Sequence, residues 1–316
     1  MRAVHLRMSG PFLFLPMRCL QQHTVPINYI AAERLDVYLV GVWSELPTRK
    51  SIQKALKRGG IRLADRPLSS AHRAKAGEVY ELWVTEERPG VGDYDFRHEV
   101  VYEDSWLAIL KKPAGWVVSG NQFRTVQNCL RLTLAPSPLP DALPWPRPVH
   151  RLDAPTSGLL LVAKTRSVQA ALGAQFAARA IGKHYHAIAC GYPPDEGGFR
   201  FELSDKPAHT TYTATERVRS LHNEWLSLVA VRLHTGRTHQ IRKHFAAGGF
   251  PLFGDALYSR PAVTFRGKGL MLAATRLAFA HPVTGAAIDI RLPIPNKFDS
   301  LLKREARRWA KYHAEP

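Results

Sequence analysis

The chain has 316 residues, 45% of them hydrophobic, and its 44 Lys and Arg against 26 Asp and Glu give a net charge of +18 at pH 7. The length exceeds one typical domain, and the hydrophobic fraction excludes a wholly disordered chain. So large a positive surplus indicates an anionic partner, either nucleic acid or an anionic membrane surface.

The cysteine content points to a reducing compartment. Cys19, Cys129 and Cys190 are far apart and form neither a disulfide framework nor a paired metal-binding motif. No apolar run approaches the ~18 residues that span a bilayer. We therefore expect a cytoplasmic protein without a membrane segment.

The first 30 residues are basic and contain the short apolar run FLFL between Pro11 and Pro16. This run is shorter than the ~7–15-residue core of a signal peptide. We expect residues 1–30 to be a poorly ordered extension, in which Met17 is an alternative candidate for the start of translation.

Residues 31–92 have the pattern of a small α/β module. Thr48 is a suitable N-cap and Gly59 a suitable stop for a helix whose apolar face carries Ile52, Ala55 and Leu56. Short strands are predicted to follow at 60–63 and 79–84.

The opposite face of this helix is basic and carries Lys50, Lys54, Lys57 and Arg58. Most charge runs on helices are simply solvated surface. A stripe of cations on one face is also the arrangement that contacts successive phosphates. We favour this second interpretation, in which the helix binds nucleic acid.

The remaining zone, residues 93–316, follows a linker and predicts several elements. The first part, 100–120, predicts strand, turn and strand, with KKPAG as the breaker. The segment 134–148 has six prolines, and we expect an exposed loop with no regular element. A helix is predicted over 166–181, from Val168, Leu172 and Phe176 at i, i+4 and i+8.

Strands are then predicted at 185–191, 211–218 and 225–236, which together indicate a mixed sheet. The C-terminal residues 296–316 predict a basic amphipathic helix. Its inward face is expected to carry Phe298, Leu301, Leu302 and Trp309.

The segment HRLDAPTSGLLLVAK, residues 150–164, places Asp153 between Arg151 and a tight turn that leads into an apolar strand. An Asp before a turn is often only a cap or a salt-bridge partner. Here Pro155 and Gly158 fix the turn and the apolar run anchors it, so the carboxylate is held rigidly at the edge of a sheet. This is the arrangement that catalysis requires.

The segment HTGRTHQIRKHF, residues 234–245, is a basic strand-to-helix corner. His234, His239 and His244 are five residues apart, which is the wrong step for one helical face, so we expect no metal site. Arg237 and Arg242 could hold phosphates, and a guanidinium near a partly buried Asp would keep that Asp ionised.

A third segment, GKHYHAIACG at 182–191, carries Tyr185 on a predicted strand. Its ring is either a core aromatic with a satisfied hydroxyl or a platform on which a nucleic-acid base stacks.

Together these segments resemble the RluA-type pseudouridine synthases. HRLDAPTSGLLLVAK, GKHYHAIACG, HTGRTHQIRKHF and GDALY (254–258) occur in the order of that family, and KKPAG (111–115) and FAHPVTG (279–285) fit the same pattern. The resemblance covers residues 100–295, and His150 favours this branch over the sister branch that has a glycine there. One departure is Ala273, where the family often has a histidine.

The resemblance implies an α+β fold. It consists of a mixed, mostly antiparallel pseudouridine synthase sheet with flanking helices over 93–316, preceded by an RNA-binding module of the ribosomal-protein S-four type over 31–92. A second RLD at Arg34–Asp36 lacks the TSGLLL continuation and is assigned to the first helix of the module.

The resemblance also implies the roles of the site residues. Asp153 is the essential aspartate that initiates cleavage of the glycosidic bond, Arg242 pairs with it, and Tyr185 stacks on the target base. Arg151 enters the RNA helix in place of the flipped uridine. His150, Arg237 and His239 are expected to contact RNA.

The implied activity is isomerisation of specific uridines in ribosomal or transfer RNA to pseudouridine, by a monomer without metal or other cofactor. Two alternatives stay open. One is a non-catalytic RNA-binding or ribosome-assembly factor with the same fold, and the other is a protein that uses its C-terminal basic helix at a membrane surface.

Overall fold

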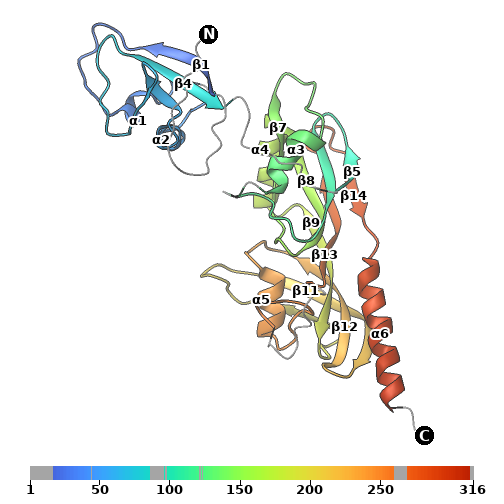
Figure 1. Ribbon diagram of the computed structural model, residues 1–316. Coiled ribbons are helices and arrows are strands. Elements are labelled where there is room, and N and C mark those ends of the chain that lie inside the picture. The colour runs from blue at the N-terminus through green and yellow to red at the C-terminus, as the bar shows by residue number, and fades with distance from the viewer. Residues whose placement is uncertain are drawn as a thin grey trace. The chain divides into compact units, whose positions relative to one another are not determined.

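The computed structural model describes residues 17–43, 45–85, 96, 98–120, 122, 124–259 and 269–313. The chain divides into two compact units, Met1–Gly92 and Asp93–Pro316 (Figure 1). Residues 1–16 of the expected extension and most of the predicted linker lie outside the described residues.

The described part of the N-terminal unit is a four-stranded antiparallel sheet with two helices. The strand order is β1-β4-β2-β3. The elements are β1 (Met17–Thr24), α1 (Leu35–Tyr38), α2 (Arg49–Lys57), β2 (Ile61–Leu63), β3 (Arg66–Pro67) and β4 (Val79–Thr85).

The expectation that all of residues 1–30 are poorly ordered is wrong for β1. This strand pairs along its length with β4, from Met17 opposite Thr85 to Thr24 opposite Val79. Its weak sequence signal is explained by its position, because an edge strand whose hydrogen bonds are made with β4 needs no strongly alternating pattern of its own.

The helix α2 begins and ends close to the predicted positions. The Thr48 side chain accepts a hydrogen bond from the Ser51 amide, which caps the helix. Ile52 and Leu56 are buried, whereas Lys50, Lys54, Lys57 and Arg58 are all exposed. The basic and apolar residues therefore occupy opposite faces.

The second RLD lies in α1, as expected. The carboxylate of Asp36 is fully buried and accepts hydrogen bonds from Gln53 (2.6 Å) and Arg49 (3.0 Å). These hydrogen bonds tie α1 to α2 and hold the pKa of Asp36 below its usual range, against the effect of burial.

The C-terminal unit is built on a ten-stranded sheet, mixed and mostly antiparallel as predicted. The main strand order is β10-β11-β12-β9-β13-β8-β6-β5, with β14 beside β13 and β7 beside β8. The strands are β5 (Glu99–Glu103), β6 (Leu107–Lys112), β7 (Ala142–Pro148), β8 (Ser157–Thr165), β9 (Gly182–Cys190), β10 (Glu196–Phe199), β11 (Thr210–Ser220), β12 (Glu224–Leu233), β13 (Leu272–Ala280) and β14 (Ala287–Arg291).

Within the described residues the helices beside this sheet are α3 (Val126–Thr133), α4 (Arg166–Ala177), α5 (Gln240–Ala247) and α6 (Asn296–His313) (Figure 1). The helix α4 ends earlier than predicted, since Arg179 takes a left-handed conformation (φ +58°) and turns the chain into β9. Phe298, Leu301 and Leu302 of α6 are buried as expected. The predicted inward residue Trp309 is only half-buried, and its ring stacks on His313 at 3.6 Å.

The expectation of no regular element over 134–148 is wrong, because Ala142–Pro148 forms β7. Among the described strands β7 pairs only with β8, and its register slips between Ala142 and Arg147. A strand with one free edge tolerates residues that lack an N–H, so the three prolines of β7 fit there.

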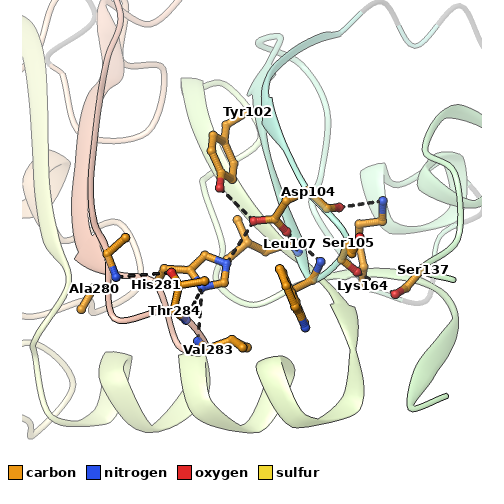
Figure 2. Close-up of polar contacts among 12 residues, drawn as sticks. Tyr102, Asp104, Ser105, Leu107, Ser137, Lys164, Ala280, His281, Val283 and Thr284 are labelled. Atoms are coloured by element: carbon orange, nitrogen blue, oxygen red, sulfur yellow. Dashed lines mark hydrogen bonds and ion pairs between the residues drawn. The ribbon is translucent and has the colours of Figure 1, made fainter. Parts of the chain in front are cut away.

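A polar network ties the β5–β6 hairpin to the turn after β13 (Figure 2). Asp104 Oδ2 accepts from the Tyr102 hydroxyl (2.8 Å) and lies 3.0 Å from His281 Nε2. His281 Nδ1 accepts from the amides of Val283 and Thr284, so Nε2 is the nitrogen that donates to Asp104. His281 of the FAHPVTG segment therefore links the turn after β13 to Asp104.

Candidate active site

Asp153 lies in the connection between β7 and β8. Its backbone carbonyl accepts from the Thr156 amide at 3.0 Å, which closes the predicted turn. The turn joins β8 at Gly158, which has φ +114° and would place a Cβ 2.1 Å from the Ala274 carbonyl oxygen. Only glycine fits this close approach to β13, and the Asp153 side chain stays 19% exposed.

Lys112 is hydrogen-bonded to the same turn through the Ala154 carbonyl. Its side chain is fully buried, and Nζ donates to the carbonyls of Pro113 (2.8 Å), Trp116 (2.8 Å) and Ala154 (3.2 Å). Burial lowers the pKa of Lys112 to about 8, and the negative charge of Asp153 partly opposes this shift. The KKPAG segment therefore fixes the residue next to Asp153.

Arg242 lies between two carboxylates. It makes two 2.8 Å hydrogen bonds to Asp255, through Nε and Nη2, and its Nη1 lies 3.5 Å from Asp153 Oδ2. Arg242 is 3% exposed and the Asp255 side chain is fully buried. Burial by itself would raise the pKa of Asp255, but hydrogen bonds from Arg242 and from the Leu257 and Tyr258 amides lower it overall.

Tyr185 is buried in β9, with 6% exposure. Burial, reinforced by the charge of Asp153, raises the pKa of its hydroxyl well above the ordinary value. The phenol is therefore protonated at neutral pH and can donate a hydrogen bond.

His239 lies on the other side of Asp153. Its backbone is left-handed (φ +56°), at the N-cap of α5. Its Nε2 is 3.8 Å from Asp153 Oδ1, and its Nδ1 is hydrogen-bonded to the Tyr258 hydroxyl at 2.8 Å. A non-glycine residue in this conformation is strained, and such strain is often found at functional sites. The ring is held against the aspartate.

His150 has a different environment. Its Nε2 accepts a 2.9 Å hydrogen bond from the Leu161 amide of β8, and its ring packs against Phe176. Burial lowers the pKa of His150 to about 4, so the imidazole is neutral at neutral pH. Its neighbour Arg151 is exposed.

A cavity of about 390 Å³ brings the predicted residues together. Its lining includes Asp153, Tyr185, Arg242, His150, Arg151, Arg237 and His239. The four predicted basic residues of α2 belong to the other unit. Among the described residues no cluster of His, Cys, Asp and Glu has the arrangement of a metal site.

The comparisons with known proteins identify the family. Residues 107–247 match the family described as RNA pseudouridylate synthase. The chain is 32% identical over 309 residues to the ribosomal large subunit pseudouridine synthase D of Neisseria meningitidis serogroup A, covering 88% of this chain and 80% of that one. It is 28% identical to the synthase C of Vibrio cholerae, covering 87% and 94%.

The chain belongs to the RNA pseudouridine synthase family. Its fold agrees, because the human RNA pseudouridylate synthase domain containing 4 superposes with a TM-score of 0.53 at 21% identity, over 65% of this chain and 92% of that one. The protein is therefore an isomerase that acts on uridine in RNA, and the non-catalytic alternative is not favoured.

Two residues of this pseudouridine synthase were not singled out by the sequence analysis. Lys112 and Asp255 lie in KKPAG and GDALY, segments that were recognised only as motifs. A lysine before a proline and an aspartate in a loop are usually exposed, so nothing in their local sequence predicts burial. Only the motifs that contain Lys112 and Asp255 indicated that these residues could matter.

Proposed function

We propose that this pseudouridine synthase converts specific uridines of large-subunit ribosomal RNA, acting as a monomer in the cytoplasm. The support is its similarity to relatives named as ribosomal large subunit synthases. The net charge of +18 suits a polyanionic substrate of this size.

The observation that carries the assignment of the site is the convergence of Asp153, Arg242 and Tyr185 in one cavity. A uridine inside a helix cannot reach a cavity of this kind, so we propose that the base is flipped out of the stack. Arg151 is exposed at the cavity lining and would occupy the gap left in the RNA.

We assign Asp153 to the reacting sugar and base. In the reaction the N1–C1′ bond of uridine breaks and a C5–C1′ bond forms, while C5 loses a proton and N1 gains one. The guanidinium of Arg242 lies 3.5 Å from Oδ2 of this carboxylate and would orient it toward the substrate. Its two bonds to Asp255 fix its direction.

Tyr185 and His239 complete the assigned site. The phenol ring would stack on the flipped base, and its protonated hydroxyl would donate a hydrogen bond. His239 would hold Asp153 from the side opposite to Arg242, with its ring oriented by Tyr258.

The test is to incubate the purified protein with transcribed large-subunit ribosomal RNA and, separately, with transfer RNA, and to map pseudouridine in both. We expect conversion at discrete positions of the ribosomal RNA. Conversion confined to transfer RNA would overturn the substrate assignment while leaving the activity intact.

A further inference from the structure

The sheet of the C-terminal unit has a second hollow, on the face opposite to the active site. Side chains alternate between the two faces of a strand. Tyr185 of β9 lines both hollows, whereas its neighbours His184 and His186 line the second one and not the active-site cavity, so their side chains lie on the other face. That other face carries a groove of about 560 Å³, whose lining includes His184, His186, Thr211, Arg232, Arg276 and Arg291.

The strand register places these side chains in one row across five strands. Thr211 of β11 is opposite Arg232 of β12, which is opposite His184 of β9. His184 is opposite Arg276 of β13, which is opposite Arg291 of β14. Neighbouring strands lie ~4.8 Å apart, so the row is roughly 19 Å long. That length exceeds a single phosphate group and suits a chain of phosphates.

The charges in the row do not cancel. Asp289 is paired with both Arg276 (2.7 Å) and Arg291 (2.9 Å), so one carboxylate serves two guanidiniums. Arg232 is exposed, and among the described residues no side-chain hydrogen bond or ion pair is made by its guanidinium. The acid in the groove lining is the exposed Glu196. A net positive charge remains.

Imidazoles add to the groove and its rim. The rings of His209 and His234 stack at 4.0 Å, and His234 is hydrogen-bonded to Thr211 at 3.0 Å. Burial, together with the charges of Arg276 and Arg232, lowers the pKa of His184. Neutral imidazoles and threonine hydroxyls are suitable donors to phosphate oxygens.

We propose that this groove is a second RNA-binding surface, which holds the phosphodiester backbone of the substrate RNA at a distance from the uridine being converted. The proposal rests on the proposed function, since it takes RNA as the substrate. It predicts that a long structured RNA uses both faces of the sheet, whereas a short one uses the active-site face alone.

The test compares two transcripts, a full-length large-subunit ribosomal RNA and a short hairpin that contains a uridine converted by the wild type. The variants are Arg232→Gln and Thr213→Glu, both at exposed positions in the groove lining. Their matched controls are Arg307→Gln and Ser300→Glu, at exposed positions of α6. Equal melting temperatures establish that each variant is folded.

We expect Arg232→Gln to weaken binding of the long transcript about three- to tenfold at 0.1 M salt, and to reduce the slope of log affinity against log salt by about 0.7–0.9. Thr213→Glu should weaken it at least as much. Conversion of the short hairpin should stay within about twofold of the wild type for all variants.

Two results would overturn the proposal. One is equal binding by the groove variants and their controls. The other is an equal loss on the long and short transcripts, which would assign the effect to the active site. Millimolar inorganic phosphate examines the first result further: equal RNA binding, together with a melting temperature that rises in the wild type but not in Arg232→Gln, would assign the groove to a small anion instead of RNA.

If the wild type converts no uridine in ribosomal RNA, the proposed substrate fails. The groove is still tested separately, because weaker binding of the long transcript by Arg232→Gln than by Arg307→Gln does not depend on conversion.

Discussion

The guanidinium of Arg242 has unequal contacts with its two carboxylate neighbours. It is held by two short hydrogen bonds to Asp255 and makes one longer contact with Asp153. Asp255 therefore sets the position of the guanidinium and leaves the oxygens of Asp153 available to substrate. The pairing of Arg242 with Asp153 was expected from the family resemblance. Asp255 was not, because its proximity to Arg242 is created only by tertiary folding.

Replacing Asp255 by Asn should therefore affect stability and catalysis together. Breaking a buried ion pair leaves an uncompensated charge, at a cost of about 3–5 kcal/mol of unfolding free energy. We also expect a fall in kcat with a smaller change in KM, since Arg242 would lose its fixed direction toward Asp153. Denaturant unfolding and steady-state kinetics measure the two effects.

The matched control is Asp299→Asn, which removes an exposed pair with Lys303 on α6. An exposed pair of this kind contributes only about 0.3–0.5 kcal/mol. Similar losses in the two variants would contradict the role assigned to Asp255.

His150 gives a prediction on pH. Burial lowers the pKa of the His150 imidazole from its ordinary value of 6.5 to about 4, so the folded protein keeps this ring neutral down to about pH 4. The unfolded chain therefore binds a proton that the folded chain does not, and stability falls as the pH falls from about 6.5 toward 4. Between pH 7 and pH 5 the loss should be about 1–2 kcal/mol.

The variant His150→Gln removes the titrating group and keeps an oxygen that can accept from the Leu161 amide. Denaturant unfolding at pH 7 and pH 5 should show a smaller loss of stability in this variant than in the wild type. Equal losses in the two proteins would show that His150 does not carry this dependence.

At the level of elements, β8 connects the turn that carries Asp153 to the core. Its interior residues are almost all buried, and its first residues pair with β13 in parallel. The apolar run LLLVA was sufficient to predict β8 from the sequence. Its neighbour β7 was missed because its prolines suppress every local strand signal, while the strand itself is stabilised by hydrogen bonds to β8. Propensity alone does not find an edge strand of this composition.

Replacing Gly158 by Ala tests whether the contact between β8 and β13 positions Asp153. The added Cβ would lie 2.1 Å from a backbone oxygen, so the strands must separate. We expect a loss of roughly 3 kcal/mol or more in unfolding free energy, and a fall in activity.

The matched variant is Gly285→Ala, at a glycine with φ +71° and no atom within 4 Å of the added Cβ. Its expected cost is the left-handed conformation alone, about 1–2 kcal/mol, with activity retained. If both variants lose the same stability and activity, the close approach at Gly158 is not the cause.

On the scale of the whole molecule, Asp153, Tyr185 and Arg242 belong to one unit and the basic helix α2 to the other. The motifs predicted the mixed sheet and the convergence of Asp153, Arg242 and Tyr185. The basic groove on the opposite face could not be predicted, because its residues come from five strands and only the register aligns them. No short segment of the sequence contains that pattern.

Replacing Lys50, Lys54, Lys57 and Arg58 by Gln tests the RNA-binding role proposed for the N-terminal unit. All four are exposed, so folding should be unaffected. We expect affinity for ribosomal RNA to fall at least about tenfold at low salt, with a salt slope smaller by about 2–4. Filter binding over a range of salt concentrations measures both, and the triple Gln variant of Lys303, Arg307 and Lys311 on α6 is the control. Affinities that match this control would remove α2 from the RNA interface.

The most direct measurement of the central claim is single-turnover pseudouridine formation by the wild type and by Asp153→Asn on one ribosomal RNA transcript, with the affinity of each for that transcript. The Asn side chain has nearly the same shape but no charge. The account predicts equal affinity and a rate lower by roughly 10³-fold or more. A rate equal to that of the wild type would contradict it.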